Sequence, residues 1–252
     1  MQNLYFKSKS KKYKSITPIE YQQAIKSFRE ILNNPIIYPK ELYTLGLNIV
    51  KKSNNFIILS EENNLGEGFY IIKYKNSSTL QNMISIPHRF HDKYTGIIGF
   101  HLIKEHNYRA IAFNTVHRKV MDSAHTSLTL FNAFHIAFAS LYPNDRIYQI
   151  HGFNGNKHKN IFIKKSQIVL SSTNRQPSQE AIEIHNCLRE EGYTSLLYGK
   201  EIFELGGTTN TQSKTLKKYD FFNFIHIELN TPLREVLRRD YLSRKKLIKC
   251  LP

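Results

Sequence analysis

The chain has 252 residues, with 36 Lys and Arg against 20 Asp and Glu, 11 His, two Cys and no Trp. A 40% hydrophobic share with 12% aromatic residues can bury a sizeable core, which argues against global disorder. No apolar run approaches the roughly 18–20 residues of a membrane helix. The net charge of +16 favours an anionic partner: nucleic acid, an acidic membrane surface or a carboxylate-rich substrate.

Residues 1–16 are polar and rich in lysine, and we predict a flexible basic arm there. They contain no apolar stretch of the kind a secretory signal peptide needs, which favours a cytoplasmic location, with export without a signal peptide as the alternative. The two cysteines, Cys187 and Cys250, have no metal-type spacing. We therefore expect neither a disulfide scaffold nor a zinc finger.

Capping and periodicity predict the order of the elements. Thr17 to Glu20 form a capping box with Pro at the first helical position, so residues 17–54 are predicted as a helical N-terminal segment. Short apolar runs between polar turns then predict strands, and helical spacing predicts helices. The strands are expected at 56–60, 68–74, 82–88, 109–116, 146–153, 161–171, 194–198 and 221–229, and the helices at 95–105, 123–141, 179–190 and 232–242.

This alternation predicts an α/β fold. A mixed, mostly parallel central sheet with helices on both faces would bury the apolar strands on both sides. No internal repeat is visible in the sequence. We expect a single domain over residues 17–252, preceded by the basic arm.

Several predicted strands end in histidine, at the positions where functional side chains gather in such sheets. His88 ends one strand and is followed by Asp92, and His151 ends another about 60 residues later. Two nearby ligands and a distant third are typical of catalytic zinc sites, which leave the fourth position open. We therefore predict a zinc site at His88, Asp92 and His151, with His91 as the competing second ligand. The alternative is a pair of surface histidines in a polar loop.

The last predicted strand carries His226 and Glu228 on one face, because strand side chains alternate. A carboxylate near the end of an apolar strand is costly unless it is solvated, paired or useful. Glu228 is therefore the candidate general base, which would take a proton from water and return it to a leaving amine. The alternative is a structural salt bridge with Arg234 or Arg238.

Other residues are candidates for contact with the substrate. Arg118 could clamp a carboxylate with two hydrogen bonds, or could be an ordinary surface arginine. Asn210 lies in a glycine-containing polar loop, and His226 and Arg234 complete the candidate set. Asp122 is expected to cap the helix that follows it, with a direct catalytic role as the alternative.

The order of these motifs resembles the zinc-dependent amidohydrolases allied to metallocarboxypeptidases, which include N-formylglutamate amidohydrolases, poly-γ-glutamate hydrolases and succinylglutamate desuccinylases. The resemblance covers roughly residues 80–240. The motifs that carry it are Pro87-His88-x-x-x-Asp92, Asn114-x-x-His117-Arg118, His151-Gly152-Phe153, Gly206-x-x-x-Asn210-x-Gln212 and His226-x-Glu228-Leu229.

The resemblance implies a zinc-dependent hydrolase of amide bonds. His88 and His151 match the two histidine ligands, Asp92 takes the place of the acidic ligand, and Glu228 matches the catalytic glutamate. Arg118 falls where relatives hold a substrate carboxylate. The chain departs from the metallocarboxypeptidase pattern at position 91, which is His rather than the usual Glu.

The implied substrate is a small carboxylate-bearing or peptide-like amide. The main alternative is a nucleic-acid-binding protein or nuclease that uses the basic surface, although no nucleic-acid-binding motif is visible. A third possibility is a binding protein that has the fold and has lost the chemistry.

Overall fold

The computed structural model describes residues 9–62, 64–66, 68–74 and 81–252, so residues 1–8 of the predicted arm lie outside the described residues. The described strands are β1 (Leu47–Lys52), β2 (Phe56–Glu61), β3 (Phe69–Lys73), β4 (Met83–Ile86), β5 (Ala110–Phe113), β6 (Ile147–Phe153), β7 (Ile168–Ser171), β8 (Ser195–Leu197) and β9 (Phe224–Asn230). The helices are α2 (Pro18–Asn33), α3 (Lys40–Thr44), α4 (Thr95–Glu105), α5 (Leu130–Leu141), α6 (Ile161–Lys165), α7 (Gln179–Glu190), α8 (Thr211–Lys217), α9 (Thr231–Leu237) and α10 (Tyr241–Lys249), with a 3₁₀ turn, η1, at Gly155–Lys157.

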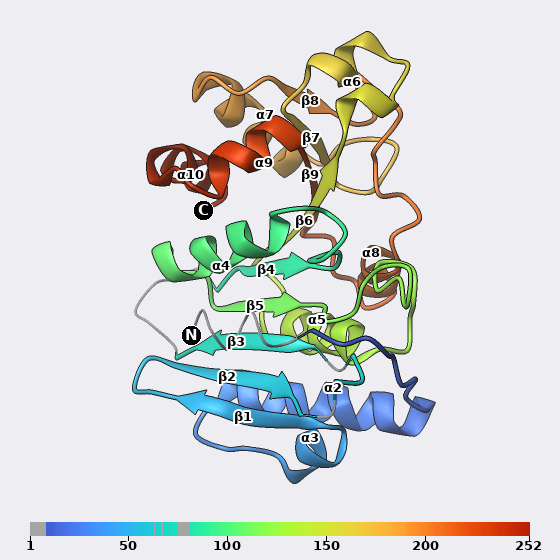
Figure 1. Ribbon diagram of the computed structural model, residues 1–252, viewed down its shortest axis with the longest axis vertical. Helices are drawn as coiled ribbons and strands as arrows, with labels where there is room; N and C mark the ends of the chain where they lie inside the picture. Colours follow the sequence, from blue (N-terminus) through green and yellow to red (C-terminus); the bar gives the residue numbers. More distant parts are fainter. Residues whose placement is uncertain (1–8, 63, 67, 75–80) are drawn as a thin grey trace.

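The described strands form one nine-stranded sheet in the order β1-β2-β3-β5-β4-β6-β9-β7-β8, which runs from bottom to top in Figure 1. The central strands β5, β4, β6 and β9 are parallel to one another. The strands on one side, β1 to β3, join antiparallel, and on the other side β7 lies antiparallel to β9 and parallel to β8. The predicted α/β class with a mixed sheet and a parallel centre is confirmed.

Helices cover both faces of the sheet, and each face has its own core. On one face α4, α7, α9 and α10 pack against strand residues such as Ile84, Ile150 and Ile227. On the other face α2, α3, α5 and α8 pack against Met83, Ile147 and neighbouring residues. This division follows from the alternation of side chains along each strand.

The face covered by α5 changes character along the central strands. In β6 it begins with Ile147 and continues with Gln149 and His151, and in β9 it begins with Phe224 and continues with His226. All of these side chains are buried. The apolar half of this face packs against helices, and the polar half lies toward the carboxyl ends of the parallel strands, where sheets of this kind place their sites.

The structure departs from the predicted elements at several places. Residues 47–52 form the edge strand β1, within the segment predicted to be helical. Residues 161–171, predicted as one strand, divide into α6 and β7, because Asn160 caps a short helix that ends at Ser166. The helix predicted from residue 123 begins only at Leu130, and the helix predicted over 232–242 is two helices, α9 and α10.

The described part of the predicted basic arm lies against the sheet. Ser10 is buried, forms a bridge with Val116 and donates its backbone N–H to the carbonyl of Thr115 at 2.8 Å. Its hydroxyl donates to the carboxylate of Glu61. Lys14 donates its backbone N–H to Leu65 at 2.9 Å. Over residues 10–14 the chain is therefore tied to the segment that follows β5 and to the end of β2 and the segment after it.

Cys187 of α7 and Cys250, directly after α10, form a disulfide, which the spacing of the two cysteines in the sequence did not lead us to expect. The bond joins two helices on the same face of the sheet. Because disulfides persist mainly in oxidising compartments, the cytoplasmic location expected from the N-terminus stays a prediction to be tested. Within the described residues, no helix combines the length and apolar character that crossing a membrane demands.

We expect the disulfide to contribute substantially to stability. It closes a loop of 63 residues, for which the loss of chain entropy in the unfolded state corresponds to about 4 kcal/mol. Cys187→Ser should therefore lower the free energy of unfolding by roughly 2–4 kcal/mol in urea denaturation. Wild-type protein in reducing agent is the matched control and should show the same loss. Equal stability of the oxidised and reduced proteins would contradict a structural role for the bond.

Candidate metal centre

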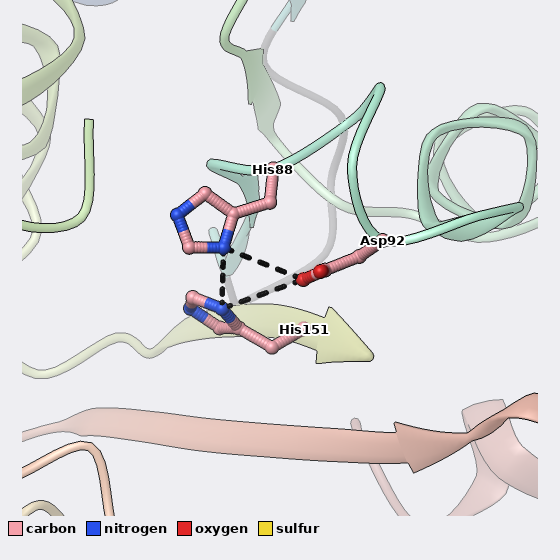
Figure 2. Close-up of side chains that lie close together, drawn as sticks. All are labelled: His88, Asp92 and His151. Atoms are coloured by element: carbon pink, nitrogen blue, oxygen red, sulfur yellow. Dashed lines mark hydrogen bonds and ion pairs between the residues drawn. The ribbon is translucent and has the colours of Figure 1, made fainter. Parts of the chain in front are cut away.

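Three side chains from separate parts of the chain converge at the carboxyl ends of β4 and β6. His88 follows β4, Asp92 lies in the turn before α4, and His151 belongs to β6. The carbonyl of His88 accepts the backbone N–H groups of His91 and Asp92, at 2.9 and 2.8 Å, and this tight turn brings the Asp92 carboxylate back to the imidazole. Figure 2 shows the two imidazole rings and the carboxylate pointing toward one another.

The donor atoms of these three residues lie close together. The two Nδ1 atoms are 3.2 Å apart, and Asp92 Oδ2 lies 3.4 Å from His88 Nδ1 and 3.7 Å from His151 Nδ1. All three residues are buried, and they could hold a metal ion. Zinc bonds of about 2.0–2.1 Å at tetrahedral angles place donor atoms roughly 3.3 Å apart, close to these separations.

The other ring nitrogen of each histidine is already engaged. His88 Nε2 lies 2.8 Å from Asp122 Oδ1, and His151 Nε2 lies 2.8 Å from Gln149 Oε1. Both partners are oxygens that can only accept a hydrogen bond, so each Nε2 carries the proton. A ring that is neutral then presents a lone pair at Nδ1, and the two Nδ1 atoms face each other and a carboxylate oxygen. A cation fits between them.

The pKa shifts of these groups come from burial acting with or against the hydrogen bonds and charges of their neighbours. Burial favours neutral His88, but hydrogen bonds to Asp122 and Asp92 outweigh it and raise the pKa of His88 above its ordinary value. Burial, together with the positive charges of His226 and His88, holds the pKa of His151 well below its ordinary value. Burial raises the pKa of Asp122, but the hydrogen bond from His88 and the neighbouring positive charges outweigh this and lower it to about 2.

Glu228 and His226 lie beside His151 on the neighbouring strand. His151 and Glu228 are paired in the parallel register of β6 and β9, and the rings of His151 and His226 lie 4.5 Å apart between centroids. His226 Nε2 is 3.3 Å from Glu228 Oε1. Within the described residues, buried Glu228 Oε2 and His226 Nδ1 have no hydrogen-bond partner. Neither structural salt bridge considered for Glu228, with Arg234 or with Arg238, is among the ion pairs of the described residues.

Arg118 stands at the edge of this cluster. Its side chain is 39% exposed, and its Nε donates to Asp122 Oδ2 at 2.8 Å. Asp122 thus joins His88 on one oxygen and Arg118 on the other. Within the described part of the chain, the two terminal nitrogens of Arg118 make no hydrogen bond, so they are available to an anion.

Arg234 and Asn210, the other residues predicted to contact the substrate, are buried and engaged inside the protein. Arg234 donates to the carbonyls of Leu229, Lys93 and Phe153 and to the hydroxyl of Thr231. These contacts tie α9 to the turn before α4 and to the end of β6, so Arg234 has a structural role. Its substrate-binding role stays a prediction.

Asn210 caps α8 by accepting the backbone N–H of Ser213 at 3.0 Å, and its amide nitrogen donates to Gln149 Oε1 at 2.5 Å. His91, the competing metal ligand, is exposed and lies outside the cluster. Its ring faces His117 at 5.4 Å between centroids and is 6.5 Å from that of His88.

Two residues next to the cluster were not recognised from the sequence. Asp122 was expected to cap a helix, but it holds His88 and Arg118 and accepts the N–H of Ala124 at 3.2 Å. Gln149 was not considered, although its position two residues before His151 places it on the same strand face. The alternation of side chains along the strand is the signal that could have predicted Gln149 beside His151.

No protein-family model matches the chain, and no curated protein matches it. Among solved structures, the chain is similar to the zinc-free apo form of YNDL, with 14% identity and a TM-score of 0.47 over 73% of this chain and 89% of that one. It is also similar to an aspartoacylase family protein from Mesorhizobium loti, with 9% identity and a TM-score of 0.45 over 82% of this chain and 70% of that one. Neither likeness assigns a role to any residue of this chain.

A glycine beside the cluster gives a direct test of its packing. A Cβ at Gly152 would stand 2.5 Å from Cζ of Arg234, which four hydrogen bonds hold in place. We expect Gly152→Ala to lower the free energy of unfolding by about 1–3 kcal/mol, measured in urea. In an Arg234→Ala background the penalty should largely vanish, because the colliding group is gone. Additive effects of the two changes would contradict this explanation.

Proposed function

We propose that the protein is a zinc-dependent hydrolase that cleaves an amide bond in a carboxylate-bearing substrate. The observation that carries this proposal is the convergence of two Nδ1 atoms and one carboxylate oxygen, at 3.2, 3.4 and 3.7 Å, in a buried site. Two histidines and one carboxylate are a common ligand set of catalytic zinc, with the fourth position open to water or substrate.

His88, Asp92 and His151 would hold the metal. Asp92 fits this role better than His91, because its carboxylate lies within the cluster and the His91 ring points elsewhere. The hydrogen bonds at His88 Nε2 and His151 Nε2 are of the kind that orient histidine ligands in metal sites. Bound zinc supplies a Lewis acid, which polarises a substrate carbonyl and makes water a better nucleophile at neutral pH.

We assign the proton transfer to Glu228. Its Oε1 faces His226 Nε2, while its Oε2 has no partner among the described residues. We infer that Oε2 accepts a proton from the attacking water and returns it to the leaving amine. His226 limits the movement of the carboxylate during this transfer, since it contacts both Glu228 and the ring of His151.

We assign recognition of the substrate carboxylate to Arg118. Its Nε is anchored by Asp122, and its two terminal nitrogens make no hydrogen bond within the described residues. A guanidinium in this state binds a carboxylate with two parallel hydrogen bonds. The anchor also sets the distance between the recognised carboxylate and the metal ligands, because Asp122 contacts His88 as well.

Metal analysis tests the ligands and the base separately. We expect about one zinc ion per chain in wild type, little in His88→Ala, Asp92→Ala or His151→Ala, and full metal content in Glu228→Gln. Hydrolysis of N-acyl and γ-glutamyl amides should fall roughly 10²–10⁴-fold in Glu228→Gln, because only the proton transfer is lost.

His91→Ala is the matched control for these variants, since it removes a neighbouring histidine from outside the cluster, and it should retain both metal and activity. A wild-type protein that takes up no zinc would end the hydrolase proposal. In that case a salt-dependent shift on mixed DNA or RNA would favour the nucleic-acid alternative.

Substrate pairs test the role of Arg118. We expect wild type to prefer an amide substrate with a free carboxylate over its methyl ester, and Arg118→Ala to lose roughly 10–100-fold in kcat/KM for the carboxylate form, as expected for a charged hydrogen-bond pair. Lys119→Ala removes a nearby exposed charge and should leave the preference unchanged. The methyl ester lacks the carboxylate, so a loss of its hydrolysis in Arg118→Ala would reveal a disturbance of Asp122. An equal loss on both substrates would show that Arg118 acts through Asp122 and not on the carboxylate.

A further inference from the structure

A chain of buried polar side chains extends from the metal centre into the core below it. Gln149 contacts His151, Ser85 on β4 contacts Gln149, and His135 on α5 contacts Ser85. Gln149, Ser85 and His135 are each 0% exposed. Buried polar groups are costly unless each finds its partner, so the direction of every hydrogen bond in this chain is constrained by its neighbours.

The direction of these hydrogen bonds is fixed first at the backbone carbonyl of Phe131. His135 Nδ1 lies 2.6 Å from the carbonyl oxygen of Phe131, which can only accept, so Nδ1 carries a proton. Burial lowers the pKa of His135 to about 4, and the ring is therefore neutral and its Nε2 is unprotonated at neutral pH. The Ser85 hydroxyl, 2.7 Å away, must donate to that Nε2.

Ser85 then fixes the orientation of the Gln149 amide. Because its hydroxyl proton is committed to His135, Ser85 Oγ accepts from Gln149 Nε2 at 3.0 Å. The second N–H of that amide faces Gln212 Oε1 at 3.2 Å. Gln212 is oriented independently, since its Nε2 donates to the carbonyl of Ser123 at 2.6 Å. Two separate anchors thus place the nitrogen of Gln149 away from the metal centre.

The oxygen of Gln149 consequently faces His151. It lies 2.8 Å from His151 Nε2 and 2.5 Å from Asn210 Nδ2. Asn210 cannot be reversed, because its Oδ1 accepts the backbone N–H of Ser213. An oxygen with these two neighbours can only accept from both, so His151 carries its proton on Nε2.

We propose that Gln149 is a positioning residue, which fixes His151 in the Nε2–H tautomer and keeps the Nδ1 lone pair directed at the other two ligands before the metal binds. The inference rests on the proposed metal site for its functional meaning. Its geometry rests only on the hydrogen bonds of Gln149, Ser85 and His135. His88 receives the equivalent support from a carboxylate, Asp122, and His151 receives it from a neutral amide.

Ring-nitrogen NMR of the metal-free, nitrogen-15-labelled protein tests the proposal directly, at a pH at which His151 is neutral. We expect a single Nε2–H tautomer for His151 in wild type. Gln149→Leu removes the acceptor and keeps a similar side-chain volume. In this variant we expect His151 to lose the Nε2–H tautomer or to show a mixture of the two neutral tautomers. A wild-type His151 protonated on Nδ1 would overturn the proposal, and this measurement does not depend on any variant folding.

Zinc affinity, measured by competition with a chelator, supplies the second readout. Loss of a supporting hydrogen bond typically weakens metal binding about 10–100-fold, and we expect this loss in Gln149→Leu. Gln149→Met takes the place of the leucine variant if that variant does not fold. Affinity within twofold of wild type in a folded leucine or methionine variant would overturn the proposal.

The two proposals fail in different ways. If wild type binds no zinc but His151 carries its proton on Nε2, the hydrolase proposal fails and the positioning by Gln149 stands. If wild type binds zinc and the Gln149 variants leave both tautomer and affinity unchanged, the positioning role fails alone.

Discussion

The parallel register of β4, β6 and β9 is the constraint on which the rest of the site depends. It places Ser85 beside Gln149 and His151 beside Glu228, on the sheet face that α5 covers. A one-residue slip would turn these side chains into the apolar core on the other face. The strong apolar pairing that surrounds them, with Ile150 and neighbouring residues in that core, therefore holds the polar cluster in place as well as stabilising the sheet.

This register also explains how one face of the sheet can be hydrophobic at one end and carry the polar site at the other. Near the amino ends of the strands the face packs against helices through residues such as Ile147 and Phe224. Toward the carboxyl ends, the residues on this face are polar: Gln149, His151 and His226. Within the described residues their polar groups have hydrogen-bond partners, except His226 Nδ1 and the neighbouring Glu228 Oε2. The transition needs no break in the strands, because each strand crosses from one environment to the other.

The sequence could predict the ends of the strands and the histidines that stand there, because alternation and turn residues are local signals. It could not predict the disulfide, since Cys187 and Cys250 are 63 residues apart and meet only through the packing of two helices. It also could not identify the partner of His88, because Asp122 is equally suitable as a helix cap. The prediction of Asp92 left His91 as a competing ligand, because the turn after His88, and not the spacing, decides which of the two side chains faces His88.

The charges around the cluster give a physical reason why it should hold a cation. Asp92, Glu228 and Asp122 are three carboxylates, whereas Arg118 and Arg234 are the two guanidinium groups placed to balance them. When both ligand histidines are neutral, as metal binding requires, the three carboxylates outnumber the two guanidinium groups by one. Buried charge without a partner destabilises a fold, so a divalent ion bound here would favour the folded state as well as the chemistry. Stability and metal affinity are then coupled, because both depend on the same group of carboxylates.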